Sequence, residues 1–172
     1  MKILSTTMLV LAATATLGGC ATRGGVATST RDRNIASAQG FLDDLLLHGE
    51  PDRAKARVAP NFEFRYMGRP DVPELARLTE PFDREAYFGE FLALVADVLP
   101  NGIVLTTTHM VADDRAVALL MDGDAEGRFG EYDNRYVFYF EFENGLISRL
   151  YEYNSDLLAM RSLWGYRLVA PE

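Results

Sequence analysis

The chain has 172 residues, of which 48% are hydrophobic and 24% are charged, and its formal net charge is −8. This balance is typical of one globular domain that buries its own core. The negative charge argues against nucleic acid and against electrostatic adhesion to anionic lipid, so we expect no nucleic-acid partner. One cysteine and two separated histidines leave no zinc-like spacing. We therefore expect no metal and no cofactor.

The N-terminus has the three parts of an export signal. Lys2 precedes an apolar run over residues 3–17, and the small residues before Cys20 provide a cleavage site. The run is too short and too rich in threonine for a comfortable transmembrane helix. Leu17-Gly18-Gly19-Cys20 resembles the lipobox of bacterial lipoproteins. This resemblance implies that residues 1–19 are a signal peptide and that Cys20 carries the lipid.

The residue after the cysteine bears on localisation. Ala21 rather than an aspartate follows Cys20, and in lipoproteins of this kind that implies the outer membrane. We expect a protein of the bacterial cell envelope that faces the periplasm and contacts the membrane through its lipid anchor only. The alternative is that Cys20 is simply a small residue beside the cleavage site of a non-lipoprotein signal. Residues 20–31 are expected to form the lipidated cysteine and a flexible tether.

The folded part is expected to begin near Asp32 and to continue to residue 172. Apolar residues at helical spacing predict a helix that stops at Gly49, and a second short helix is expected over residues 52–58. Alternating aromatic residues over 62–67 predict a strand with one aromatic face. Residues 68–82 contain three prolines and indicate a long irregular loop. Asp83 is expected to cap a third helix, which ends before Pro100.

The second half of the chain predicts strands without intervening helices, over residues 103–111, 115–125, 131–143 and 146–154. Asp113-Asp114 and Asn144-Gly145 are expected to form tight hairpin turns. Helices first and a meander of strands after them indicate an α+β domain, with the helices packed on one face of a curved antiparallel sheet.

Residues 127–156, GRFGEYDNRYVFYFEFENGLISRLYEYNSD, carry a recognisable family pattern. The pattern consists of Gly130, Tyr132, Asn134, Tyr136, Phe138, Phe140, Gly145, Ile147, Glu152 and Tyr153. It resembles the SnoaL-like branch of the nuclear transport factor two and ketosteroid isomerase superfamily. The resemblance implies a cone-shaped roll with about three N-terminal helices. It leaves the activity open, because this fold serves isomerases, cyclases, dehydratases, epoxide hydrolases and binding modules. One departure is Asp156, which stands one place later than the aspartate of many relatives.

The last hairpin is expected to form an aromatic surface with polar tips. A two-residue turn at 144–145 would pair residues whose numbers sum to 289, with Tyr136 opposite Tyr153 and Asn134 opposite Ser155. A cone lined in this way suits a flat hydrophobic ligand. The alternative is that the rings form the core between sheet and helices. The candidate ligand-binding residues are Tyr66, Asn134, Tyr136, Glu152 and Tyr153.

Glu152 has two interpretations. The expected pairing puts it on the opposite face from the aromatic rings, beside Arg135, where an exposed ion pair contributes little. The resemblance implies instead that a glutamate at this position borders the cavity. We therefore keep Glu152 among the candidates.

The candidate catalytic residues are Asp122 and His109. The expected turn at 113–114 puts both on one face about four residues apart, roughly 13 Å, which is too far for a direct dyad. An isomerase-like reaction needs a carboxylate base against an apolar wall and a donor that stabilises an oxyanion. Asp122 or Asp124 would be the base and Tyr66 or Tyr136 the donor.

Three functions follow from these patterns. The first is an envelope lipoprotein whose aromatic cone binds a small hydrophobic molecule. The second is a metal-free enzyme of the isomerase, cyclase or dehydratase type, which uses a pocket carboxylate with a tyrosine or histidine. The third is a structural or partner-binding lipoprotein that forms a homodimer through its sheet.

Overall fold

The structure is a computed structural model, and it describes residues 28–167 and 169. The predicted signal peptide, Cys20 and most of the predicted tether lie outside these residues. The first helix begins at Thr30, slightly before the expected start, because the Ser29 side chain accepts a hydrogen bond from the Asp32 amide and caps the helix. No helix within the described residues is long and apolar enough to span a membrane.

Apart from one 3-10 helix, the helices form three groups before the meander and one after it. The first group is α1 (Thr30–Leu42) with its π-helical continuation η1 (Asp43–Leu47), and the second is α2 (Pro51–Ala56). The third runs without a break through α3 (Arg84–Ala86), the π-helical η3 (Tyr87–Phe91) and α4 (Leu92–Val98). A 3-10 helix, η2 (Pro73–Thr79), occupies the expected irregular loop, and α5 (Asp156–Trp164) follows the last strand.

The strands build one six-stranded sheet in the order β2-β1-β8-β7-β4-β3. Their bounds are β1 Val58–Tyr66, β2 Phe82–Asp83, β3 Val104–Ala112, β4 Ala116–Asp124, β7 Arg135–Glu143 and β8 Leu146–Tyr153. A short hairpin of β5 (Glu126–Gly127) and β6 (Gly130–Glu131) forms a second sheet.

One pairing departs from the expected antiparallel sheet. β1 runs parallel to β8, whereas every other pairing within the described sheets is antiparallel. No hairpin turn links these two strands, so chain connectivity does not dictate their direction. β1 also begins earlier than expected and includes Pro60, which lies where the register between β1 and β8 shifts.

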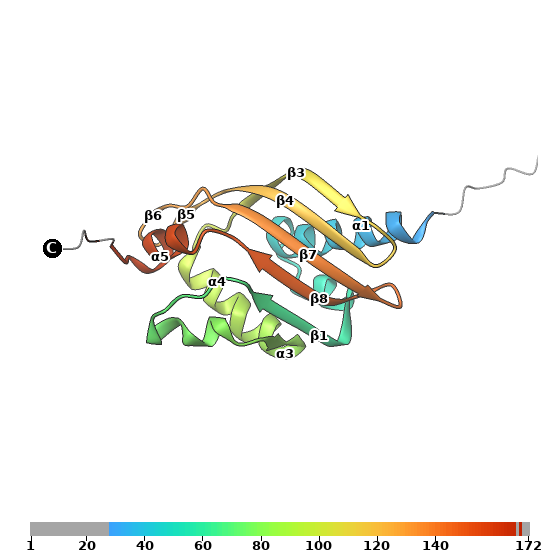
Figure 1. Ribbon diagram of the computed structural model, residues 1–172, viewed down its shortest axis with the longest axis horizontal. Coiled ribbons are helices and arrows are strands. Elements are labelled where there is room, and N and C mark those ends of the chain that lie inside the picture. Colours follow the sequence, from blue (N-terminus) through green and yellow to red (C-terminus); the bar gives the residue numbers. More distant parts are fainter. Residues whose placement is uncertain (1–27, 168, 170–172) are drawn as a thin grey trace, which may run out of the picture.

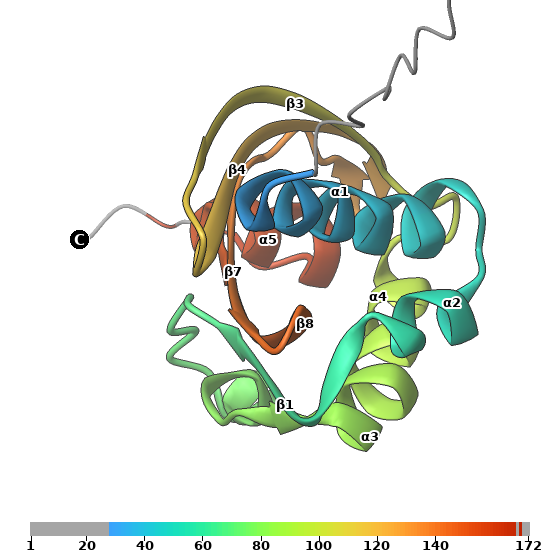
Figure 2. The ribbon, with the colours of Figure 1, turned by 90° about the vertical axis from the view of Figure 1, so that its right-hand side faces the viewer.

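The sheet curves around the helices (Figures 1 and 2). In Figure 2, β3, β4, β7, β8 and β1 follow one curve, and α1 and α4 lie on its concave side. α5 lies at one end of the sheet beside β5 and β6. The aromatic face of β1 packs into this interior, where the Phe64 ring lies 4.8 Å from Tyr87 and 4.4 Å from Phe91. The predicted α+β class is confirmed.

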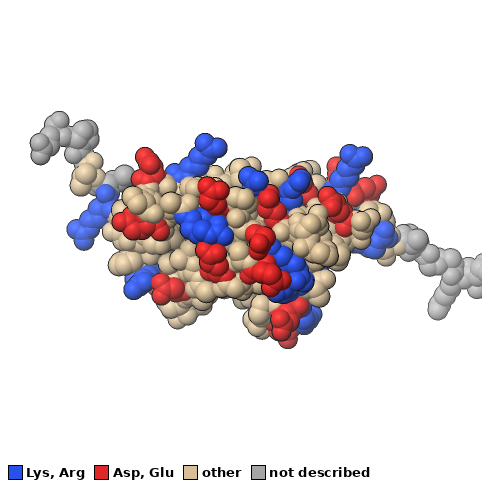
Figure 3. All heavy atoms as spheres, turned by 90° about the horizontal axis from the view of Figure 1, so that it is seen from below, with Lys and Arg blue, Asp and Glu red and all other residues tan. Residues whose placement is uncertain are grey.

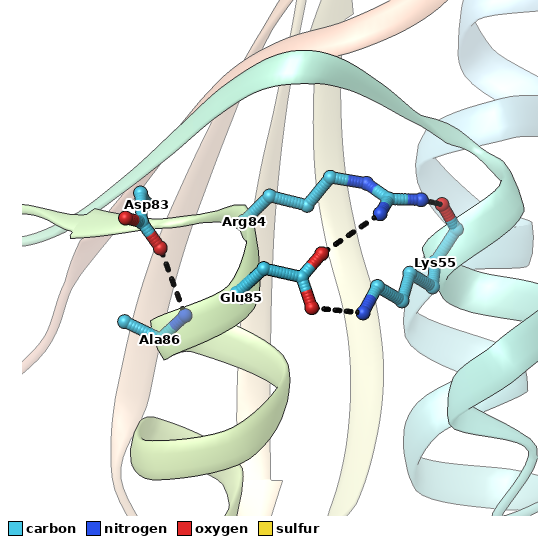
Figure 4. Close-up of polar contacts among 5 residues, drawn as sticks. All are labelled: Lys55, Asp83, Arg84, Glu85 and Ala86. Atoms are coloured by element: carbon cyan, nitrogen blue, oxygen red, sulfur yellow. Dashed lines mark hydrogen bonds and ion pairs between the residues drawn. The ribbon is translucent and has the colours of Figure 1, made fainter.

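Polar contacts fix the helix that carries Tyr87. Asp83 caps α3 through the Ala86 amide at 2.9 Å, as expected from the sequence. The Lys55 ammonium donates to Glu85 at 2.6 Å, and Arg84 donates to the backbone carbonyl of Lys55 at 3.0 Å (Figure 4). These contacts join the end of α2 to the start of α3. On the face seen in Figure 3, acidic and basic side chains are interspersed rather than gathered by sign.

The hairpin between β7 and β8 shows why one expected register is wrong. Asn144 and Gly145 have φ angles of 51° and 80°, and the pairs beside this turn follow the predicted sum. A bulge then follows: Ser148 is the extra residue, and its hydroxyl donates to the Glu141 carbonyl at 3.3 Å. Beyond the bulge every pair is shifted by one, so Glu152 lies opposite Phe138, and Tyr153 lies opposite Val137 rather than Tyr136.

The hairpin between β3 and β4 also differs from the expected one. Ala112 pairs with Val117, and the Asp113 amide donates to the Ala116 carbonyl at 3.0 Å. The Asp113 carboxylate accepts from the amides of Arg115 and Ala116, which centres the turn on residues 114–115. The burial pattern of β4 then puts Asp122 on the exposed face.

Candidate ligand-binding pocket

A cavity of about 100 Å³ lies between the concave side of the sheet and the helices. Its polar groups come from Tyr66 on β1, Tyr87 on η3, Tyr132 in the segment before β7, Tyr136 on β7, Glu152 on β8 and Asn154 just after β8. None of the described residues that line it is Lys, Arg or His. The rest of the lining is apolar, and includes Leu45, Leu46, Phe91, Leu92, Leu94, Val95, Ile103, Leu105, Phe138 and Trp164.

Glu152 is the only ionisable carboxyl among the described lining residues. The bulge at Ser148 turns its side chain to the same face as Phe138. Burial raises the pKa of Glu152 to about 7, while the hydrogen bond from Asn154 acts in the opposite direction. The Asn154 amide donates to Glu152 Oε1 at 3.0 Å. The other carboxylate oxygen makes no hydrogen bond with any residue that the structure describes, so it is available to a ligand.

The tyrosines gather around this carboxyl. Burial raises the pKa of Tyr132 to about 12 and raises the pKa values of Tyr66, Tyr87 and Tyr136 further. The negative charge of Glu152 contributes to all of these shifts, because a nearby anion disfavours ionisation of a phenol. The hydroxyls therefore stay protonated at any physiological pH and can donate hydrogen bonds.

A polar network holds Tyr66 at the edge of the pocket. The Tyr66 hydroxyl lies 2.7 Å from Asp156 Oδ1 and 2.9 Å from Asn154 Oδ1. Asp156 Oδ2 accepts from the Arg69 amide at 2.9 Å. A larger residue at position 68 would displace the network, because an added Cβ would lie 1.9 Å from Asp156 Oδ1. The network runs without a break from the loop after β1 to the Glu152 carboxyl.

A second glycine makes room for Tyr136. Gly123 lies on the inward face of β4, and an added Cβ would lie 2.7 Å from the Tyr136 ring. The ring is thereby able to stack on Phe138, with 5.3 Å between centroids and 6° between planes. Tyr136 is 6% exposed and Phe138 is 5% exposed. The two rings therefore belong to the buried core and also form part of the pocket wall.

The structure brings three of the predicted ligand-binding residues together and separates the others. Tyr66, Tyr136 and Glu152 line the pocket, whereas Asn134 and Tyr153 do not. Asn134 is buried and accepts hydrogen bonds from the amides of Arg135 and Ser155. Its own amide donates to the Tyr132 hydroxyl at 3.1 Å. Asn134 therefore ties the start of β7 to the end of β8 and supports the pocket from behind.

Asp122, His109 and Tyr153 lie on the convex face of the sheet, away from the pocket. Asp122 is exposed and forms an ion pair of 3.4 Å with Arg135. His109 is exposed on β3, opposite Leu120, and Tyr153 is 46% exposed. Asp122 and His109 share one face of the sheet, as expected, but this face is the convex one, because Leu119 and Met121 occupy the inward positions of β4. Neither residue can therefore act in the pocket.

Three polar pocket residues were not among the predicted candidates: Tyr87, Tyr132 and Asn154. Tyr132 stands within the family pattern, which was a usable signal. Tyr87 reads as part of the apolar stripe of its helix, and Asn154 reads as a turn residue, so neither gave a separate signal. Within the described residues, no group of three His, Cys, Asp or Glu side chains is arranged to hold a metal ion.

Comparisons with known proteins support the fold of the chain and do not identify its activity. No protein-family model matches the chain, and no curated protein matches it. Among solved structures, one similar protein carries the name of a SnoaL-like polyketide cyclase and comes from Jannaschia sp. CCS1. It aligns with a TM-score of 0.66 and 12% identity, over 84% of this chain and 100% of that one.

Two further solved structures are similar to this chain. An NTF2-like protein of unknown function from Burkholderia pseudomallei aligns with a TM-score of 0.66 and 14% identity, over 76% of this chain and 97% of that one. A protein named as a ketosteroid isomerase from Kribbella flavida aligns with a TM-score of 0.53 and 20% identity, over 76% of this chain and 83% of that one. The chain has the nuclear transport factor two-like fold.

Proposed function

We propose that this protein binds a small, mostly apolar molecule in the pocket around Glu152. The observation that carries the proposal is one carboxyl among tyrosine hydroxyls in an otherwise apolar cavity. Such a site excludes water from most of a ligand and leaves a few polar groups to orient it. Glu152 would contact the ligand's polar group through its free carboxylate oxygen.

A panel of small apolar alcohols and ketones tests this proposal. Binding is measured by chemical-shift changes of the purified protein, and we expect the perturbed signals to gather at Tyr136, Glu152 and the residues around them. The variant Leu105→Trp, which fills the pocket, is expected to abolish these changes, while Val104→Trp on the neighbouring exposed position leaves them intact. Shift changes that survive Leu105→Trp would contradict the proposal.

A second candidate is an enzyme of the isomerase, cyclase or dehydratase type. The observation that favours it is the pKa of Glu152, which burial raises to about 7. A carboxyl with this pKa accepts or donates a proton near neutral pH, and the protonated tyrosines would stabilise a developing oxyanion. Glu152 would take the role first considered for Asp122. Turnover of an enolisable ketone that is lost in Glu152→Gln, with ligand binding retained, would support this candidate.

We also propose that the chain is exported and anchored by lipid at Cys20 to the outer membrane, facing the periplasm. The basis is the sequence alone: Lys2, the apolar run and Leu17-Gly18-Gly19-Cys20. Mass spectrometry of the mature protein is expected to show a diacylglyceryl group on an N-terminal cysteine. The variant Cys20→Ser should leave the chain without lipid. A mature N-terminus beyond residue 20 would contradict the anchor.

We further propose that the protein forms a homodimer through the convex face of its sheet. Two rows of mostly apolar side chains cross the strands there, and Asp122–Arg135 and Glu141–Arg149 ion pairs flank them. The rows are Val111, Ala118, Tyr139 and Tyr151, and His109, Leu120, Val137 and Tyr153. Sedimentation at micromolar concentration should show a dimer that Leu120→Lys converts to a monomer. A wild-type monomer would contradict it.

A further inference from the structure

The charge of the pocket restricts the kind of molecule it accepts. Glu152 has no cationic partner among the described lining residues. When it ionises, the pocket holds one negative charge that only Asn154 contacts through a hydrogen bond. An anionic ligand would add a second negative charge in a mostly apolar site, which is costly. A cationic ligand would supply the missing partner.

The aromatic walls favour the same kind of ligand. Tyr66, Tyr87, Tyr132 and Tyr136 contribute rings to the lining, and Phe138 stacks on Tyr136. The face of an aromatic ring attracts a cation, and the attraction grows when water is excluded. The titratable groups that face Glu152 are these tyrosines, from β1, η3, β7 and the segment before β7, while Asp156 on α5 contacts the far side of the pocket edge through the Tyr66 hydroxyl. All of them are neutral or negative, so none repels an ammonium group.

The size of the cavity sets the size of the ligand's head. At about 100 Å³, it is smaller than the cavity of about 150 Å³ that holds a benzene molecule. It therefore accommodates an ammonium group and a few carbons. Leu46 belongs to the lining and is 36% exposed, which marks where the pocket reaches solvent. A longer apolar chain can extend past Leu45 and Leu46.

We propose that the ligand of this pocket is a small apolar amine, bound as its ammonium ion between the Glu152 carboxylate and the surrounding tyrosine rings. This inference rests on the proposed small-molecule binding and narrows it to one ligand class. The ammonium donates to the free carboxylate oxygen, and the apolar chain lies along the leucines toward the mouth.

The experiment compares three probes of similar length: hexylamine, 1-hexanol and hexanoate. Dissociation constants are measured at pH 6 and pH 8 with the purified protein. Hexylamine, like the lysine side chain, is protonated at both values. The pKa of Glu152 is raised to about 7 by burial, so its ionised fraction rises from about one tenth to about nine tenths over this range. Hexylamine should therefore bind about tenfold more tightly at pH 8 than at pH 6.

The other probes and two variants complete the test. At pH 8, hexylamine should bind at least about tenfold more tightly than 1-hexanol, and hexanoate should bind more weakly than either. Glu152→Gln should remove the preference for the amine and its pH dependence while 1-hexanol still binds, which shows that the pocket is folded. Glu141→Gln, on the convex face and paired with Arg149, should change nothing.

The outcomes separate this inference from the proposed function. Equal binding of 1-hexanol and hexylamine at pH 8 would overturn the amine and leave small-molecule binding standing. A preference for hexylamine that persists in Glu152→Gln would also overturn it, because the charge would then act elsewhere. Binding of none of the three probes to the wild-type protein would contradict both the amine and the proposed function.

Discussion

The Asn154 side chain donates a hydrogen bond of 3.0 Å to the Glu152 carboxyl, two residues before it on the same strand end. This is the one polar contact between the described residues that stabilises the ionised form of Glu152. Asn154→Ala removes the donor, so we expect the pKa of Glu152 to rise further. The midpoint of the pH dependence of hexylamine binding would report it. Asn61→Ala, on an exposed part of β1, should leave the midpoint unchanged.

The raised pKa of Glu152 makes stability depend on pH. The folded state holds the proton up to about pH 7, whereas the unfolded state releases it near its ordinary value of about 4.3. Between these values the folded state binds more protons, so the free energy of unfolding falls as pH rises and levels off above pH 7. Glu152→Gln has no carboxyl at this position, so its free energy of unfolding should not fall in this way. We expect the variant to be more stable than wild type by about 3 kcal/mol at pH 8.

Urea unfolding at pH 4 and pH 8 measures this difference. At pH 4 both proteins carry a neutral side chain at position 152, and their stabilities should be similar. A variant that is less stable than wild type at pH 8 would show that Glu152 has a charged partner in the folded state.

Gly68 should not tolerate a side chain. An added Cβ would lie 1.9 Å from Asp156 Oδ1 and 2.4 Å from the Tyr66 ring, so Gly68→Ala must displace one of these two hydrogen-bonded side chains. We expect a loss of about 1–3 kcal/mol in the free energy of unfolding and weaker ligand binding. Gly89→Ala is the matched control, because nothing lies within 4 Å of its added Cβ. Thermal unfolding should show the control at or slightly above wild-type stability.

Asp44 is a buried charge that depends on two arginines. Its side chain is 2% exposed, and it lies 2.7 Å from Arg57 Nε and 3.1 Å from Arg53. Asp44→Asn leaves Arg57 without its partner, and we expect a loss of about 3 kcal/mol in the free energy of unfolding. Asp97→Asn breaks an exposed pair with Arg128 and should cost less than about 1 kcal/mol. Equal losses in the free energy of unfolding for the two variants, measured with urea, would show that the burial of an ion pair does not determine its contribution to stability.

The sequence predicts most of the fold because the fold depends on local signals. Asp83 caps its helix, the aromatic face of β1 points inward, and Asn144-Gly145 forms the expected turn. These features follow from hydrophobic period, capping and turn chemistry over a few residues. The parallel pairing of β1 with β8 has no such local signal, because it depends on packing between segments that lie far apart in the chain.

The site was harder to predict because one residue decides it. The extra residue at Ser148 shifts the pairing by one and moves Glu152 from the convex face to the pocket. A second bulge near Thr108 and the turn at residues 114–115 change the register between β3 and β4, but His109 and Asp122 still share one face, which is the convex one. Neither bulge is marked by a glycine or a proline in the sequence. The inward positions of Tyr66 and Tyr136 follow from the simple alternation of a strand, so the sequence alone indicates them.

The most direct test of the central claim is a pH titration of Glu152. The chemical shift of its side-chain carboxyl carbon in ¹³C-labelled protein reports the titration, and Glu152→Gln assigns the signal. A carboxyl in an apolar ligand pocket should titrate near pH 7. Saturating 1-hexanol should move the midpoint higher, because the ligand displaces water from the carboxyl. A midpoint near 4.3, the value of an exposed glutamate, unchanged by 1-hexanol, would contradict the claim that Glu152 lies in a ligand-binding pocket.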